Sequence, residues 1–155
     1  MSRQNIAVVI LVFAVIGFAA ASPSVGLAEQ TAPGNVNVPT GEVGLGSVEL
    51  PRRVMANGQA LASGTYDLRV TADSANPDAP GQLAVLERWV EFRQGDEVKG
   101  REVVSIVPHS EIDGVAKTAP PGSGSSRVEM LKDNEYLRVW VNQDNTHYLI
   151  HLVAG

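Results

Sequence analysis

Residues 58–70, Gly-Gln-Ala-Leu-Ala-Ser-Gly-Thr-Tyr-Asp-Leu-Arg-Val, decide the fold. The second half of this stretch alternates strictly: Tyr66, Leu68 and Val70 are apolar, and the residues between them are polar. Alternation with a period of two predicts a β-strand with one buried face. Glycines on either side of Leu61 predict turns, so the strand is entered through a tight turn. This pattern indicates an antiparallel β protein.

The residues just before this strand predict a β-hairpin. Asn57-Gly58 accepts a positive φ at both positions of a two-residue turn, which favours a type I′ hairpin. Residues 53–56 would lead into this turn, and residues 59–61 would return from it. The first strand pairing is therefore local.

Similar alternation recurs along the rest of the chain. Further strands are expected at residues 47–50, 83–93, 98–107, 136–141 and 146–153. Pro108 ends one of them, and Gly100 predicts a bulge or bend within it. Residues 72–82 and 109–126 predict long polar loops, the second with one helical turn at 111–117. About seven short strands without sustained helical periodicity predict an all-β fold, either an antiparallel β-sandwich or a small barrel.

Residues 1–28 predict a secretory signal peptide. Arg3 precedes sixteen residues, Ile6 to Ala21, without a polar side chain, and small residues allow cleavage after Ala21 or Ala28. An uncleaved membrane anchor is the alternative, but this apolar stretch falls short of the roughly 20 residues that span hydrocarbon. We therefore expect cleavage, no stable membrane insertion afterwards, and a product in the bacterial periplasm or outside the cell.

Residues 29–46 are rich in Pro, Gly, Asn, Thr and Val. This composition predicts a flexible linker between the cleavage site and the fold. Val36, Val38 and Val43 would be the apolar residues of an edge strand if one formed there. The folded domain is expected to comprise residues 47–155.

The charge balance and the absence of cysteine limit which partners and which cellular compartment are expected for this chain. The chain has 12 Lys+Arg, 17 Asp+Glu and no cysteine. Removing residues 1–28 takes away Arg3 alone, which leaves 11 basic against 17 acidic residues and a net charge of −6. An acidic surface repels phosphate, so no nucleic-acid partner is expected. Without cysteine there is neither a disulfide nor a lipid-attachment site, and export without disulfides suits a bacterial envelope.

Residues 61–70 resemble a strand entry of secreted bacterial β-sandwich proteins, which include uncharacterised exported families and carboxypeptidase-regulatory-like modules. Gly64-Thr65-Tyr66 carries this resemblance. The blocks 87–92 and 136–140 are also similar to those of uncharacterised exported proteins. The resemblance implies a β-sandwich fold and transfers no catalytic residue.

Reactive and metal-binding motifs are weak in this chain. His109-Ser110-Glu111 with Asp113 has the residue types of a nucleophilic triad, but they lie within five positions and no Gly-x-Ser-x-Gly elbow is present. His147 and His151 are four residues apart, which on a strand is about 13 Å and too far to share an ion. The acidic turns match no calcium-loop spacing. We expect no metal, no cofactor and no enzymatic activity.

The last hairpin carries the candidate binding surface. With a two-residue turn at residues 143–144, Trp140 would face His147 and Tyr136 would face His151. Leu137, Val139, Tyr148 and Ile150 would then form the core side. The candidate ligand-binding residues share the opposite face: Tyr136, Arg138, Trp140, His147 and His151.

This face has two interpretations. Exposed aromatic rings with an arginine and neutral imidazoles resemble a platform for a sugar or a peptide. Alternatively, the face packs against a second sheet or against the 109–126 loop, because large aromatic residues are usually partly buried. We expect an exported, non-enzymatic binding or accessory module for an unknown protein or carbohydrate. The other hypotheses are a structural envelope protein that self-assembles through an edge strand and, less favoured, a hydrolase.

Overall fold

The computed structural model of this chain describes residues 38–75 and 86–155. The chain divides into two units, residues 1–34 and 35–155, and all described residues belong to the second. The predicted signal peptide therefore lies outside the described residues. In the described ranges no helix combines the length and the apolar character that crossing a membrane requires.

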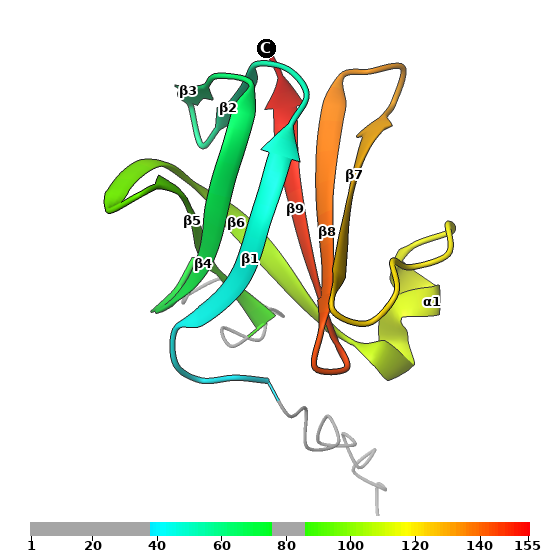
Figure 1. Ribbon diagram of the computed structural model, residues 1–155. Helices are drawn as coiled ribbons and strands as arrows, with labels where there is room; N and C mark the ends of the chain where they lie inside the picture. The colour runs from blue at the N-terminus through cyan, green and yellow to red at the C-terminus, as the bar shows by residue number, and fades with distance from the viewer. Residues whose placement is uncertain (1–37, 76–85) are drawn as a thin grey trace, which may run out of the picture. The chain divides into compact units, whose positions relative to one another are not determined.

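Nine strands of the described residues form one antiparallel sheet (Figure 1). In chain order they are β1 Val43–Leu50, β2 Val54–Ala56, β3 Gln59–Leu61, β4 Gly64–Ser74, β5 Glu87–Gln94, β6 Glu97–Pro108, β7 Ser125–Leu131, β8 Tyr136–Gln143 and β9 Thr146–Ala154. A 3-10 turn, η2 (His109–Glu111), and a short helix, α1 (Ile112–Val115), follow β6. The all-β prediction is confirmed. The sheet is open, so the alternative of a small barrel is wrong.

The central strand is β9, which ends at the C-terminus (Figure 1). β8 pairs with it along one side, and β7 follows β8. On the other side β6 pairs with residues 146–150 and β2 with residues 153–154. Beyond β6 come β5, β4 and finally β1. The sheet curves so that β1 comes within 8 Å of β7 and β8, measured between Cα atoms, without pairing with them.

One face of this curved sheet encloses the main core. Tyr66, Leu68 and Val70 of β4 are buried there, as their alternation predicts. The Tyr66 ring meets Phe92 of β5 edge-on, with 6.1 Å between the ring centroids. The Tyr66 hydroxyl donates to the carbonyl of Ala62 at 2.9 Å, which satisfies its polar end. The strand that decides the fold therefore contributes the centre of the core.

Local turn chemistry agrees with the first hairpin and with the bend in β6. Asn57 and Gly58 have φ values of 44° and 80°, and β2 pairs with β3 around them as predicted. In β6 the pairing register with β5 shifts beside Gly100, where Phe92 pairs with Gly100 but Arg93 pairs with Val98. The bulge predicted at Gly100 is thus confirmed.

The register of the last hairpin differs from the prediction by two residues. Asp144 and Asn145 form the turn, with φ values of 49° and 61°, so Trp140 lies opposite Leu149 and Arg138 opposite His151. Aspartate and asparagine accept a positive φ more readily than glutamine does, which excludes Gln143 from the turn. Because the shift is even, every side chain remains on its predicted face.

Three boundaries lie elsewhere than predicted. β4 continues to Ser74, into the loop predicted at residues 72–82, whose residues after 75 lie outside the described ranges. β1 begins at Val43, inside the linker predicted at residues 29–46, and Val38 is a core residue with 7% of its surface exposed. The predicted loop 109–126 ends in β7, an edge strand that the sequence did not indicate. β7 has no regular alternation of buried and exposed residues, because most of its side chains are half-buried.

Candidate functional site

The structure divides the five predicted site residues into two groups. Trp140 and His147 are 0% exposed and lie beneath η2 and α1. Arg138 is also buried, with 8% of its surface exposed. Tyr136 is half-buried and His151 is exposed. The prediction that these residues form one exposed platform is therefore corrected: η2, α1 and the residues after them cover the Trp140 half of the face.

In the covered half, one chain of hydrogen bonds determines where the protons lie. The Trp140 indole Nε1–H donates to His147 Nδ1 at 3.1 Å, and His147 Nε2 lies 2.8 Å from His109 Nδ1. An indole can only donate, so His147 Nδ1 carries no hydrogen and His147 Nε2 donates to His109. Burial and then the neighbouring His109 lower the pKa of His147, which favours this neutral form.

The same arrangement of protons bears on the triad-type residues His109, Ser110, Glu111 and Asp113, for which the sequence predicts no catalytic role. His109 accepts at Nδ1, so its hydrogen is on Nε2 and that nitrogen is a donor instead of a general base. Ser110 makes no hydrogen bond with His109 within the described residues. The triad residues are thus adjacent in sequence without the nucleophile–base contact that the chemistry needs.

Two arginines complete the cover over Trp140. The guanidinium carbons of Arg138 and Arg127 lie 4.8 Å and 5.2 Å from the Trp140 ring centroid. Arg138 also pairs with Glu129 and donates to Thr118 Oγ1 at 3.2 Å. These contacts give Arg138 a structural role, because they tie the segment after α1 to the sheet.

The exposed half contains an open hollow of about 340 Å³, lined by Leu131, Lys132, Tyr136 and His151. We call it the Tyr136 hollow. Leu131 ends β7, Tyr136 begins β8 and His151 lies on β9, while Lys132 belongs to the turn between β7 and β8. Three neighbouring strands and one turn therefore converge on one surface cavity.

Lys132 is held in an unusual conformation at the rim of this hollow. Its φ is 49°, and the next two residues, Asp133 and Asn134, also have positive φ. Lysine is less suited to this region than aspartate or asparagine, at a cost of order 1 kcal/mol. Its ammonium lies 5.2 Å from the centroid of the Tyr136 ring, and no ion pair among the described residues includes it. Residues held in strained backbone conformations cluster at functional sites.

His151 adds a second polar group to the hollow. Desolvation and then the nearby Arg138 lower the pKa of His151, while Glu129 opposes them. The imidazole is therefore neutral near pH 7 and offers one donor and one acceptor. Sequence reasoning found Tyr136 and His151 but missed Leu131 and Lys132. The Asp133-Asn134 pair, which favours a turn with positive φ, was the available signal for a cavity rim there.

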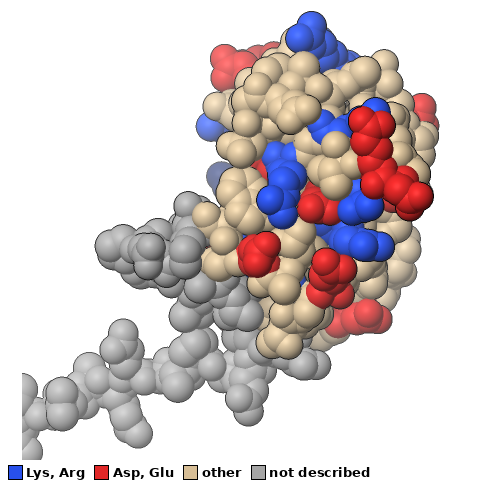
Figure 2. All heavy atoms as spheres, turned by 90° about the vertical axis from the view of Figure 1, so that its left-hand side faces the viewer, with Lys and Arg blue, Asp and Glu red and all other residues tan. Residues whose placement is uncertain are grey.

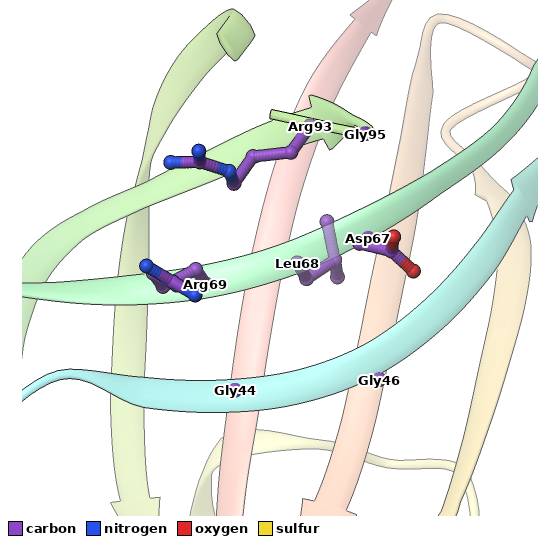
Figure 3. A pocket seen from close by; sticks show the side chains of 7 residues that line it. All are labelled: Gly44, Gly46, Asp67, Leu68, Arg69, Arg93 and Gly95. Carbon is purple, nitrogen blue, oxygen red and sulfur yellow. The ribbon is translucent and has the colours of Figure 1, made fainter. Parts of the chain in front are cut away.

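A second hollow, of about 300 Å³, lies over β1, β4 and β5. Figure 3 shows Gly44 and Gly46 on β1, where no side chain fills the space, Arg69 beside them on β4, and Arg93 beyond β4 on β5. Both arginines are already engaged by this chain's own carboxylates. This hollow is therefore a weaker ligand site than the Tyr136 hollow.

On the surface around this second hollow, basic side chains are likewise paired with acidic side chains of the same chain. Figure 2 shows acidic and basic side chains interspersed over the face that carries β4 and β5. The ion pairs of this region are Arg69–Glu42, Arg93–Glu91, Arg101–Glu91 and Lys99–Glu97. Alternating charges of this kind keep a sheet face solvated and give no strong field of one sign.

Comparisons with protein-family models, curated proteins and solved structures found no match to this chain. In the described ranges no group of three or more metal-ligating side chains comes together. The fold and the geometry of the Tyr136 hollow are therefore the basis for a functional conclusion.

Proposed function

We propose that this protein is an exported, non-enzymatic binding module whose ligand, a carbohydrate or a protein segment, binds in the Tyr136 hollow. One observation supports this proposal above the others. The hollow combines an aromatic ring, a strained and unpaired lysine and a neutral imidazole at one surface cavity. Cavities with apolar walls and a few convergent polar groups are the usual form of ligand sites.

The chemistry of the lining indicates the class of ligand. Leu131 and Tyr136 offer apolar area, while Lys132 donates and His151 can both donate and accept. This mixture suits a ligand with one apolar face and several hydroxyl or carbonyl groups, as in a sugar ring or an extended peptide. Val153, which pairs with Tyr136 and is half exposed, extends the apolar part of the surface.

Export to the periplasm or the medium is part of the proposal and depends on the sequence. Residues 1–28, which lie outside the described residues, have the charge, the apolar stretch and the small residues of a signal peptide. Fractionation of cells that express the full chain, with mass spectrometry of the product, would test it. We expect a new N-terminus at Ser22 or Glu29.

Binding can be tested with the isotope-labelled protein. Soluble oligosaccharides and peptides are screened by NMR, and the affinity of a hit is measured for Tyr136→Ala and Lys132→Gly. Tyr136→Ala should weaken binding by about tenfold or more, as expected for a central aromatic contact. Lys132→Gly should weaken binding while relieving the strained turn.

Arg101→Ala, on the outer face of β6, is the matched control and should leave the affinity unchanged. A ligand that shifts only resonances far from Tyr136 and His151, or an affinity that survives both substitutions in the hollow, would contradict this site.

A structural, self-assembling protein is the second candidate. The sheet is open, and β1 and β7 each lack a hydrogen-bonded neighbour on one side within the described residues. β1 carries a bulge between Gly44 and Gly46, which protects an edge, whereas β7 pairs with β8 without interruption. β3 also lies at an edge but has only 3 residues, so self-association would use β7. Light scattering that shows a monomer at all concentrations would oppose this candidate.

A further inference from the structure

The segment that covers Trp140 is attached to the sheet by an apolar contact and by polar contacts, one of which involves titratable side chains. Ile112 of α1 and Ala116 pack with Val107, Trp140 and Leu149 in a cluster outside the main core. Next to this cluster, the hydrogen-bond chain from Trp140 through His147 to His109 joins the sheet to η2. The His109 amide also donates to the carbonyl of Asn145 at 3.2 Å.

The hydrogen-bond chain through His147 and His109 is fully satisfied in one protonation state only, the state in which both rings are neutral. The two rings share two hydrogens when both are neutral, and each hydrogen has a place: one on His147 Nε2 and one on His109 Nε2. If His147 takes a third proton, its Nδ1–H points at the indole Nε1–H of Trp140, and two donors face each other. If His109 takes it at Nδ1, that donor faces the Nε2–H donor of His147.

Once the pair is protonated, neither a change of the His147 tautomer nor a rotation of the His109 ring avoids the loss of a hydrogen bond. Moving the His147 hydrogen from Nε2 to Nδ1 restores the contact with His109 but places a donor against the indole. Turning the exposed His109 ring away leaves the Nε2–H of buried His147 without its acceptor. A buried donor without an acceptor is unfavourable, so every protonated form weakens the attachment of η2.

We propose that His109 and His147 form an acid-operated latch: the first proton taken by the pair releases η2 and α1 from the sheet and uncovers Trp140. The segment that opens is short and exposed along much of its length, and its apolar contact involves two of its residues, Ile112 and Ala116. Small units of this kind open locally without unfolding the domain. The released surface is apolar and lies beside Arg138, so opening changes what this face can bind.

Charged groups on the elements packed around the pair include Arg127 and Glu129 of β7, Arg138 of β8, Asp144 of the last turn, Glu111 of η2 and Asp113 of α1. Burial and then His109 are the causes that lower the pKa of His147. A folded-state pKa below the unfolded value of about 6.5 means that the docked state is fully favoured above that pH. Docking is lost as the pH falls below about 6.5 and through the folded-state pKa.

NMR on the full chain tests the latch. At pH about 7.5, nitrogen shifts should show both rings with the hydrogen on Nε2, and the Ala116 amide, which donates to the Ile112 carbonyl, should be protected. At pH about 5, Ala116 protection, corrected for intrinsic exchange, should fall by about tenfold or more while the β9 amides stay protected.

His147→Asn, which can still accept from the indole but does not titrate, should abolish this fall. If this variant does not fold, His147→Gln, whose amide oxygen can also accept from the indole without titrating, serves the same purpose, and His151→Asn should retain the transition. A hydrogen on His147 Nδ1 at neutral pH would overturn the proposal. So would Ala116 protection that survives protonation of the pair, or that falls together with the protection of β9.

Discussion

Trp140 lies on the outward face of β8 and is fully buried because three kinds of group cover its ring. Apolar residues of α1 and the segment after it pack against it, the guanidinium groups of Arg127 and Arg138 lie over it, and His147 accepts from its indole nitrogen. Each neighbour comes from a different part of the chain. The residue therefore acts as the anchor of the outer layer.

Substitutions at Trp140 should separate the anchoring of the outer layer from its polar contact. Trp140→Ala leaves a large cavity and should lower the free energy of unfolding by about 3–5 kcal/mol. Trp140→Phe keeps most of the apolar area, loses the donor to His147, and should cost less than half as much. Urea denaturation measures both. A Trp140→Ala protein as stable as the parent would show that the outer layer does not pack on this ring.

Arg88 of β5 is the corresponding anchor for the chain before β1. It is 2% exposed, and it donates from Nε to the Thr71 carbonyl at 2.6 Å and from its terminal nitrogens to the carbonyls of Pro39 and Gly41. Burial lowers the pKa of Arg88, but a guanidinium stays charged in proteins. Its three-way fork therefore joins the chain before β1 to β4.

Replacing Arg88 by Lys should show how much this fork matters. Lysine carries the charge but cannot reach three diverging carbonyls in one plane, so some are left without a donor. Arg88→Lys should cost about 2–4 kcal/mol in urea denaturation. Arg101→Lys, at an exposed ion pair with Glu91, is the matched control and should cost less than about 1 kcal/mol. Equal effects at both positions would refute the role given to Arg88.

At the scale of elements, the residues at the turns determined which hairpins the sequence could predict correctly. Asn57-Gly58 predicts the β2–β3 hairpin because both residues tolerate positive φ, and the structure has it. In the last hairpin two dipeptides compete, and Asp144-Asn145 forms the turn. The two-residue shift in register left each side chain on its predicted face of the sheet, because the face depends only on whether the shift is even or odd.

The candidate site could be predicted only in part for a related reason. Alternation identifies which side chains share a face, but it does not tell what lies on top of that face. The contacts of Ile112 and Ala116 with Trp140 join residues more than twenty positions apart. Lys132 enters the site through a backbone conformation that its side-chain type does not favour.

Gly100 offers a prediction at the same scale, since it marks the bulge of β6. A Cβ at this position would lie 2.9 Å from Leu61 Cδ2 and 3.6 Å from Ala56 Cβ, and both side chains are buried. Gly100→Ala should therefore cost about 1–3 kcal/mol through overpacking. Gly114→Ala in α1, where a Cβ meets nothing within 4 Å, should be neutral or slightly stabilising. Thermal denaturation of the two variants tests the contrast, and a Gly100→Ala protein that matches the parent would contradict it.

At the scale of the whole molecule, the sheet curves around its core but stays open. β1 approaches β7 and β8 without hydrogen bonding to them. Val43 of β1 and Val128 and Met130 of β7 are half-buried at the border of the core. β1 and β7 are thus joined by side-chain packing alone, and each keeps one unpaired edge within the described residues.

Native-state hydrogen exchange should follow this arrangement. β9 has paired strands on both sides, and between residues 148 and 150 it is buried on both faces. Its amides, with Ile150 at the centre, should exchange only through global unfolding, while those of β1 and β7 should exchange at least about tenfold faster through local opening. Hydrogen exchange should be measured near pH 7.5, where the His109–His147 contact is intact. If β1 amides exchanged as slowly as Ile150, the sheet would open as one unit, and the distinction between a central strand and free edges would not hold.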